Sequence, residues 1–254
     1  MRKFLMAAVT AAAMTFGAGV AAADDWQGLY GGVLLGGQAG TERKVETTGT
    51  TAFRTLTPTI APNELKPKTG GLTYGLVGGY TFASAGGLIW GIEGDLVDGG
   101  DDKSASFSGA PIPGLAPAGI TTSARKDYGL RGTLRGRLGV AVSDRALIYG
   151  TGGLAVGRVK TIASVVANGA PTVAWTGEKK ETLTGWTLGA GVEFKATDRI
   201  ILRGEYLYTD LGDQTVTAAG NATVRSVAAL NGIDYVAKAD YRGGELRAGL
   251  VFKF

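Results

Sequence analysis

The last fourteen residues of the chain alternate strictly between apolar and polar positions. One face of the segment 241–254 carries Leu246, Ala248, Leu250, Phe252 and Phe254, and the other carries Glu245, Arg247, Gly249, Val251 and Lys253. A period of two is that of a β-strand. One apolar face and one charged face are typical of a strand that has lipid on one side and a packed polar interior on the other.

Seven earlier segments follow the same alternation. They span residues 26–40, 72–82, 88–96, 126–142, 147–160, 183–194 and 200–211. In the segment 126–142, the pattern places Tyr128 and Leu134 on the apolar face and Asp127 and Arg131 on the opposite face. Glycines blur the first segment, where Leu29, Val33 and Leu35 face lipid with Tyr30 inside, or the reverse.

The connections between these segments alternate between long and short. Polar segments at 41–69, 98–123, 161–181 and 212–239 read as long exposed loops, two of them rich in proline, which removes ladder donors. Tight turns are expected at 83–87, 143–145 and 195–199. Short turns at one rim and long loops at the other predict an all-β fold, an eight-stranded antiparallel up-and-down transmembrane β-barrel at residues 24–254. A soluble β-sandwich also shows alternation, but aromatic residues near the strand ends favour the barrel.

The amino-terminal residues 1–23 have the features of a secretory signal peptide. Arg2 and Lys3 precede a small apolar run, and Ala21, Ala22 and Ala23 provide a cleavage pattern, so we expect export and cleavage near Ala23. An uncleaved anchor is the alternative. Removing the leader leaves 24 basic and 22 acidic residues, a net charge of +2, which argues against nucleic-acid binding.

The inward parity of the predicted strands collects an unusual set of ionic side chains. They are Glu93, Asp95, Arg131, Arg135, Arg137, Glu193, Arg203, Glu205 and Arg247. Eight strands enclose a lumen only about wide enough for side chains to fill it. We therefore expect the acids and arginines to pair across the lumen and plug it, because an isolated buried charge is costly.

Enzymatic and cofactor chemistry finds little support in the residues. The chain has no histidine and no cysteine, which removes thiolate sites and the usual activated nucleophiles. The pattern of Gly150, Gly152 and Ala155 matches a dinucleotide fingerprint but lies inside a predicted strand with no helix after it. The acidic run 98–102 lacks calcium-loop spacing, and Glu93 with Asp95 reads as part of the ion network. We expect no catalytic residue, cofactor or metal.

Three motifs resemble a known family. The runs 185–194 (GWTLGAGVEF) and 205–212 (EYLYTDLG) and the start 26–32 (WQGLYGG) look like the small porin-like β-barrels of alphaproteobacterial outer membranes, the group of 25 to 31 kDa major outer-membrane proteins. The closing spacing of Arg247, Gly249, Phe252 and Phe254 resembles the carboxy-terminal assembly signal of outer-membrane proteins. The resemblance implies an eight-stranded, opacity/OmpA-type barrel without catalytic residues.

The expected function is structural. A plugged barrel would anchor the bacterial envelope and present surface loops; a narrow porin-like channel for small solutes is the alternative, and a barrel enzyme is a third class. The expected partners are outer-membrane lipid and lipopolysaccharide, the barrel-assembly machinery and an extracellular ligand of the loops, with no nucleic acid. The loop composition names no ligand.

Overall fold

The computed structural model describes residues 26–39, 44–56, 61–67, 70–83, 88–100, 103–111, 116–169 and 173–254. The predicted leader and its cleavage site lie outside these residues, as does most of the predicted turn at 83–87. No helix in the described part of the chain is long and apolar enough to cross a membrane.

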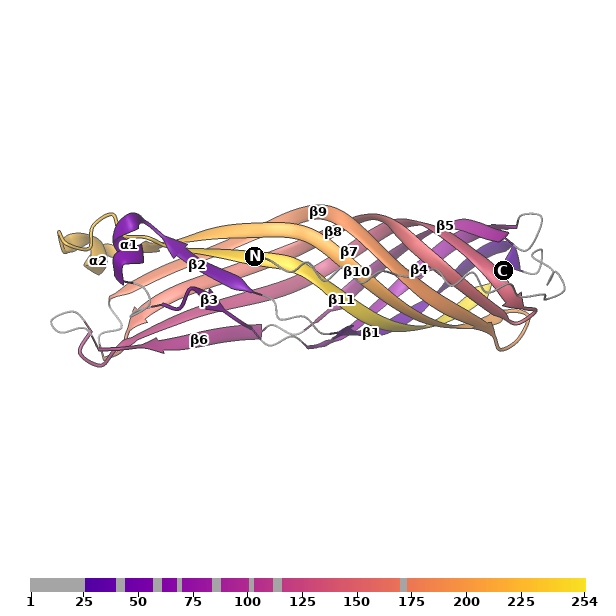
Figure 1. The fold of residues 1–254 in the computed structure, drawn as a ribbon, viewed down its shortest axis with the longest axis horizontal. Coiled ribbons are helices and arrows are strands. Elements are labelled where there is room, and N and C mark those ends of the chain that lie inside the picture. The colour runs from indigo at the N-terminus through magenta and orange to yellow at the C-terminus, as the bar shows by residue number, and fades with distance from the viewer. Residues whose placement is uncertain are drawn as a thin grey trace, which may run out of the picture.

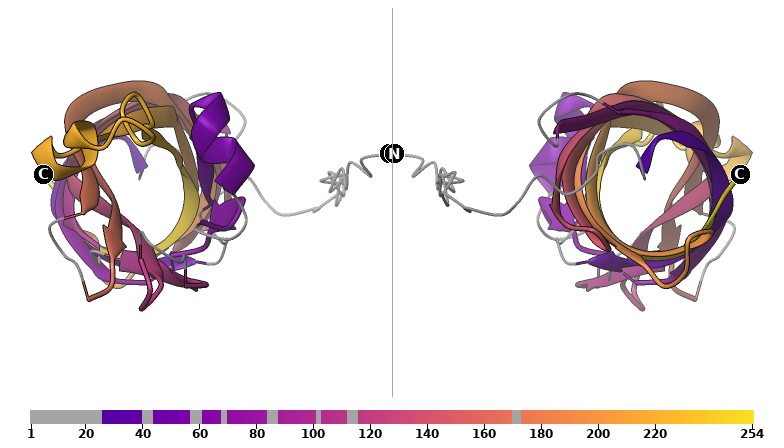
Figure 2. Two further views of the ribbon diagram at one scale, coloured as in Figure 1. Left: turned by 90° about the vertical axis from the view of Figure 1, so that its left-hand side faces the viewer. Right: turned by 90° about the vertical axis from the view of Figure 1, so that its right-hand side faces the viewer.

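A closed ring of antiparallel strands dominates the molecule, and the eight-stranded barrel is confirmed (Figures 1 and 2). Within the described residues, the ring consists of β1 (Gly28–Ala39), β4 (Leu72–Ala83), β5 (Leu88–Gly99), β7 (Ile120–Ser143), β8 (Ala146–Ala167), β9 (Ala174–Lys195), β10 (Ile200–Gly220) and β11 (Tyr235–Lys253). Strand β11 closes the ring by pairing with β1, from Tyr30 opposite Lys253 to Ala39 opposite Gly244.

An apolar band surrounds the half of the barrel that bears the short turns. Outward side chains such as Leu76, Leu134, Leu154 and Leu188 remain more than 60% exposed, as required of a surface that contacts lipid. The first strand follows the same rule: Leu29, Val33 and Leu35 are exposed, whereas Tyr30 and Leu34 are buried. Tyr30 therefore points inward, which decides between the two registers that the sequence allowed.

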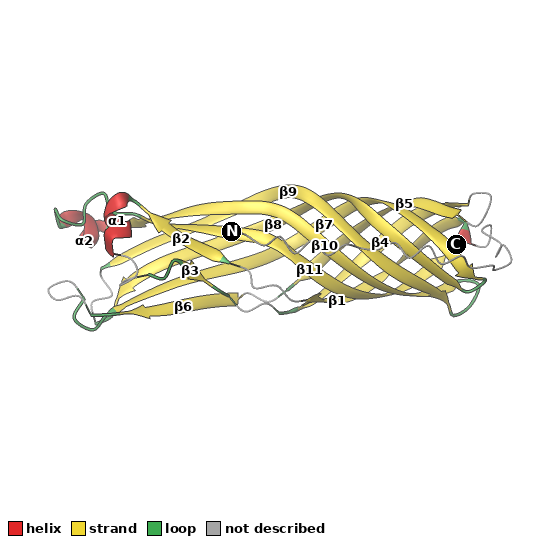
Figure 3. Ribbon diagram, in the orientation of Figure 1, coloured by secondary structure: helices red, strands yellow, loops and turns green. Residues whose placement is uncertain are grey.

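The prediction of long exposed loops is wrong for the segments 161–181 and 212–239, which are mostly strand or helix, and the described parts of 41–69 and 98–123 also contain strands or a helix. The strands β7 to β11 continue well beyond the apolar band, and β8 and β9 have 22 residues each. Further elements flank them: β2 (Val45–Gly49), α1 (Thr51–Leu56), β3 (Glu64–Leu65), β6 (Lys103–Gly109) and α2 (Ala222–Ser226). We call this continuation the extension. Figure 3 shows it to be built largely of strand, like the membrane half.

The extension has an apolar core of its own. Inward positions that the sequence offered as polar loops hold small or β-branched residues, such as Ala163 and Val165 on β8, and they pack with Phe53, Trp175 and Tyr235. We call this cluster the upper core. Ala, Val, Thr and Ser differ little in polarity, so their alternation gives only a weak strand signal. Their composition resembles that of a loop, although half of these side chains are buried.

A β-bulge corrects one further assignment. The register of β7 against β8 shifts between Tyr128 and Arg131, so the parity of β7 reverses above this point. Tyr128 packs edge-on against the buried Tyr241, with 5.1 Å between ring centroids, instead of facing lipid. Asp127 in turn lies on the outer side, where it accepts a hydrogen bond from Arg125.

Because the extension is packed, a buried charge should open it. We expect Ala163→Asp, which places a carboxylate at a fully buried position of the upper core, to make the extension sensitive to trypsin. Ser164→Asp, one residue along on the outer face, should leave the protein resistant. Limited proteolysis in detergent micelles measures both. Equally rapid cleavage of both variants and of the unmodified protein would mean that the segment 161–181 is an exposed loop after all.

Candidate functional site

The alternation of strands β5 and β7 brings opposite charges directly across from one another. Glu93 is the register partner of Arg135. Arg135 is 1% exposed, and its Nη2 atom lies 2.5 Å from a carboxylate oxygen of Glu93 and 2.8 Å from one of Asp95. Its Nη1 atom donates to Glu205 of β10 over 3.0 Å. One arginine therefore joins three carboxylates from two sides of the lumen.

A second centre lies beside the first. Arg203 of β10 lies 2.6 Å from both Glu93 and Glu193. Arg137 of β7 donates to Glu193 over 2.6 Å, and its Nη1 atom is 3.5 Å from Glu93. Glu93 therefore contacts three guanidinium groups. Each of these guanidinium groups offsets part of the cost of burying the carboxylate.

Arg247 connects β11 to the same centres, with nitrogen atoms 3.3 Å from Asp95 and 3.0 Å from Glu205. Arg131 stands apart from this group and lies 3.6 Å from Glu245. The structure thus brings together eight of the nine predicted network residues and places the ninth in a separate pair. With Glu245 included, five arginines face five carboxylates, and we call these ten residues the lumen network.

Sequence reasoning missed the neutral members of this site. Tyr30 donates to Glu93 over 2.7 Å, and Tyr149 donates to Glu205 over 2.9 Å. Hydroxyls also contribute: Thr133 donates to Asp95 over 2.7 Å, and Thr73 donates to Glu245 over 2.5 Å.

Glycines on the neighbouring strands could have indicated that the two tyrosines face inward. A Cβ atom at Gly79 would collide with the hydroxyl of Tyr30, and one at Gly191 would collide with that of Tyr149. Inward glycines at these two positions make room for the phenol rings. The Tyr149 ring also lies under Arg137, 4.0 Å from its guanidinium carbon, which is a cation–π distance.

Apolar side chains flank the network on both sides along the barrel. At the rim with the short turns, five buried side chains pack together: Trp26, Ile89, Leu147, Ile201 and Val251. We call them the rim cluster. The Nζ atom of Lys195 lies 4.3 Å from the Trp26 ring centroid and covers it. On the other side, the upper core fills the extension.

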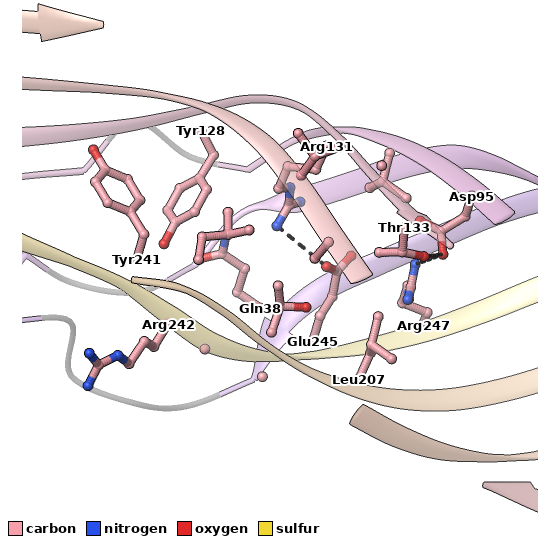
Figure 4. Close-up of a pocket in the computed structure, with 18 residues that line it drawn as sticks. Gln38, Asp95, Tyr128, Arg131, Thr133, Leu207, Tyr241, Arg242, Glu245 and Arg247 are labelled. Carbon is pink, nitrogen blue, oxygen red and sulfur yellow. Dashed lines mark hydrogen bonds and ion pairs between the residues drawn. The ribbon is translucent and has the colours of Figure 1, made fainter. Parts of the chain in front are cut away.

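A small cavity remains between the lumen network and the upper core. Its volume is about 40 Å³, enough for a few water molecules. Figure 4 shows Arg131 and Glu245 paired at its wall, with Asp95 beside Arg247. The rings of Tyr128 and Tyr241 line its upper end. The cavity therefore lies between charged side chains of the lumen network and aromatic side chains at the start of the extension.

The residues of the predicted assembly signal lie along β11. Phe252 and Phe254 point outward, and Phe254 is 80% exposed. The amide of Phe254 donates to the carbonyl oxygen of Leu29, which joins the end of the chain to β1. Gly249 faces inward, where a Cβ atom would lie 3.0 Å from Leu34. Arg247 belongs to the lumen network.

The other patterns singled out in the sequence form no built site in the described residues. Gly150 to Ala155 lie within β8, where a Cβ atom at Gly153 would collide with the backbone of Leu134. In the acidic run, the Asp98 side chain accepts a hydrogen bond from its neighbour Gly99, and residues 101 and 102 lie outside the described residues. Within the described part of the chain, no group of three or more potential metal ligands comes together.

Comparison with known proteins agrees with the geometry. Residues 8–254 match the family model described as "Outer membrane protein beta-barrel domain". A 31 kDa outer-membrane immunogenic protein of Brucella melitensis is 33% identical over 160 residues, covering 62% of this chain and 61% of the relative. A 22 kDa outer membrane protein of Rhizobium leguminosarum bv. viciae is 35% identical over 120 residues, 47% of this chain and 44% of the relative. The chain spans about three fifths or less of these relatives.

Among solved structures, the outer membrane protein OprG from Pseudomonas aeruginosa is similar in fold. The alignment covers 90% of this chain and 97% of OprG, with a TM-score of 0.53 and 13% sequence identity. At this identity, the similarity concerns the fold alone. The expected kinship with the alphaproteobacterial 25 to 31 kDa proteins is confirmed by the family match and the Brucella and Rhizobium relatives.

Removing one member of the lumen network should cost more than removing an exposed charge. We expect Arg135→Met to lower the free energy of unfolding by about 3–5 kcal/mol, because it leaves three buried carboxylates short of a partner. Arg242, which pairs with Asp210 at the outer surface, is the matched control, and Arg242→Met should change stability by no more than about 1 kcal/mol. Urea unfolding in lipid vesicles measures both. Equal losses would argue against the network as a stabilising element.

The two proposed roles of β11 can be separated by two substitutions. Phe254→Ser removes an exposed aromatic ring, so we expect a lower yield of assembled protein with little change in the stability of what does assemble. Arg247→Ala should do the reverse, because it leaves Asp95 and Glu205 short of a partner. Membrane fractionation gives the yield, and heat-modifiable gel mobility gives the stability. Normal assembly of Phe254→Ser would count against the signal.

Proposed function

The chain belongs to the outer membrane protein beta-barrel domain family, and from that premise we propose that it acts as a sealed, non-enzymatic barrel that anchors the envelope and holds a rigid extension at the cell surface. In barrels of this kind, short turns face the periplasm and longer connections face outward. The rim cluster would then lie on the periplasmic side, and the extension, with α1 and α2 at its tip, would project from the cell (Figure 1).

The observation that supports this proposal is the succession of three packed layers along the lumen. Along the barrel axis, the rim cluster, the lumen network and the upper core follow one another. An ion crossing the barrel would have to displace apolar side chains twice and separate several buried ion pairs. Each of these steps has a free-energy cost of several kcal/mol. A plugged anchor therefore fits the geometry better than a narrow channel for small solutes.

The same observation bears on the possibility of an enzyme. Glu93 and Asp95, the carboxylate pair with the strongest claim to catalysis, share Arg135 and are almost completely buried. A substrate would have no route to them through the rim cluster. The chain also contains no histidine that could serve as a general base near neutral pH. These features support a structural role for the pair.

Two further features support a surface role. The Brucella relatives are named outer-membrane immunogenic proteins, which means that they elicit an immune response. In this chain, the extension offers a stable surface for such contacts, because its strands are continuous with the membrane-embedded barrel. We extend the surface role to this protein on that basis. The assembly machinery of the outer membrane is the expected partner for the closing strand.

Electrical recording tests the sealed barrel. We expect the purified protein to give no stable, large conductance in planar lipid bilayers, because the plug has no continuous water path. A matched variant, Trp26→Ala with Leu147→Ala, removes bulk from the rim cluster while keeping the lumen network, and it should remain closed. Persistent step-like channels in the unmodified protein would overturn the sealed barrel in favour of a channel.

A further inference from the structure

A groove on the outer wall remains unexplained by the plugged barrel. It crosses β7, β8 and β9, has a volume of about 420 Å³ and is lined by Asp127, Gly129, Arg158, Lys160 and Lys180, among others. We call it the basic groove. It lies outside the lumen and shares no residue with the lumen network.

The outward side chains of β8 show where the basic groove lies relative to the apolar band. Leu154 and Val156 belong to the exposed apolar band, and the next two outward side chains on the same strand are Arg158 and Lys160. Outward positions on a strand repeat about every 7 Å. The wall thus changes from aliphatic to cationic within one step. This is the level at which the headgroups of the outer leaflet begin.

The cations in the groove are only partly compensated. Lys160 and Lys180 stand directly opposite each other on β8 and β9, an arrangement that is unfavourable for like charges. Both contact the single carboxylate of Glu178, at 3.1 and 3.4 Å. In the described part of the chain, the exposed Arg158 has no ion-pair or hydrogen-bond partner. The groove lining also contains two acids, Asp127 and Glu181, which pair with Arg125 and Lys179. Of the three cations in the lining, the two lysines therefore share Glu178, and Arg158 has no acidic partner.

The shape of the groove depends on the β-bulge of β7. The bulge places Gly129 beside Arg158, where a Cβ atom would lie 3.6 Å from the arginine Cβ. Because Gly129 has no side chain, there is space beside the Cβ atom of Arg158. Its guanidinium can then present two parallel N–H groups, which match the oxygen atoms of a phosphate.

The neighbouring face of the barrel, formed by β10 and β11, differs in how its cations are paired. On β10 and β11, Arg242 contacts Asp210 and Asp213, at 3.2 and 3.4 Å, and Lys238 contacts Asp213 at 3.0 Å. Here the cations are neutralised by acids within the protein. Within the described part of these two faces, Arg158 on β8 thus lacks an acidic partner, whereas Arg242 and Lys238 on β11 have one.

The geometry points to a binding site for a phosphate group of an outer-leaflet lipid in the basic groove, with Arg158 as the principal ligand and Lys160 and Lys180 as supporting cations. The headgroup level of the groove favours a lipid over free phosphate, because the acyl chains of the same molecule would lie on Leu154 and Val156 directly below. Such a lipid would relieve the repulsion between the two lysines.

A titration with two forms of one lipid tests the site. The probes are bisphosphorylated lipid A, the same lipid without its phosphates and sodium phosphate, each added to the purified protein in detergent micelles and followed by native mass spectrometry. We expect the phosphorylated lipid to bind at least tenfold more tightly than the dephosphorylated form. Arg158→Gln should weaken binding about tenfold, the loss expected for one charge-assisted hydrogen bond. Arg242→Gln, the control on the acidic side, should bind as the unmodified protein does.

Three results would overturn the proposal. They are equal affinity for both lipids, an equal loss in Arg158→Gln and Arg242→Gln, and binding of sodium phosphate as tight as that of the lipid. Heat-modifiable gel mobility checks that each variant is folded. If Arg158→Gln does not fold, Lys180→Gln replaces it, since this side chain is 70% exposed and should weaken lipid binding severalfold.

Discussion

Charge balance inside a closed wall is the constraint on which the barrel depends. Five arginines and five carboxylates occupy a lumen flanked by apolar layers, so each charge is tolerable only while its partners are in place. The pairs also join strands that are distant in sequence: Glu93 on β5 contacts Arg203 on β10, on another part of the ring. A slipped strand register would turn such a side chain toward lipid. The network therefore selects one register as well as filling space.

The same strands are exposed to lipid in the membrane half and to water in the extension. In the membrane half of β8, Leu154 faces outward and Thr151 is buried inside, whereas in the extension Lys160 faces outward and Val159 is buried inside. Lipid outside permits a polar interior, and water outside requires an apolar one. The polarity of the wall thus inverts along a single strand, close to the bulge that reverses the parity of β7. The basic groove lies at this transition.

Alternation alone predicted the ring, the tight turns between β7 and β8 and between β9 and β10, and the inward parity of the lumen charges. It worked there because Leu and Arg differ strongly in polarity. It failed in the extension, where Ala163 and Ser164 differ little, although the first is buried and the second is not. Proline and threonine then suggested loops. Tyr30 and Tyr149 were hard to assign because a phenol suits either face, and Tyr128 because a bulge leaves no mark in a pattern of period two.

Strand β11 has one property that concerns the order of assembly. Its membrane half borders β1, and its outer half borders β2, from Ala239 opposite Val45 to Tyr235 opposite Gly49. The chain passes from the first neighbour to the second within a few residues. Both pairings therefore depend on β11, and the ring between β10 and β1 is incomplete without it. The ion pairs that join Arg247 to Asp95 and Glu205 form only once β11 is in place, so the closure of the ring and the completion of the lumen network depend on the same strand.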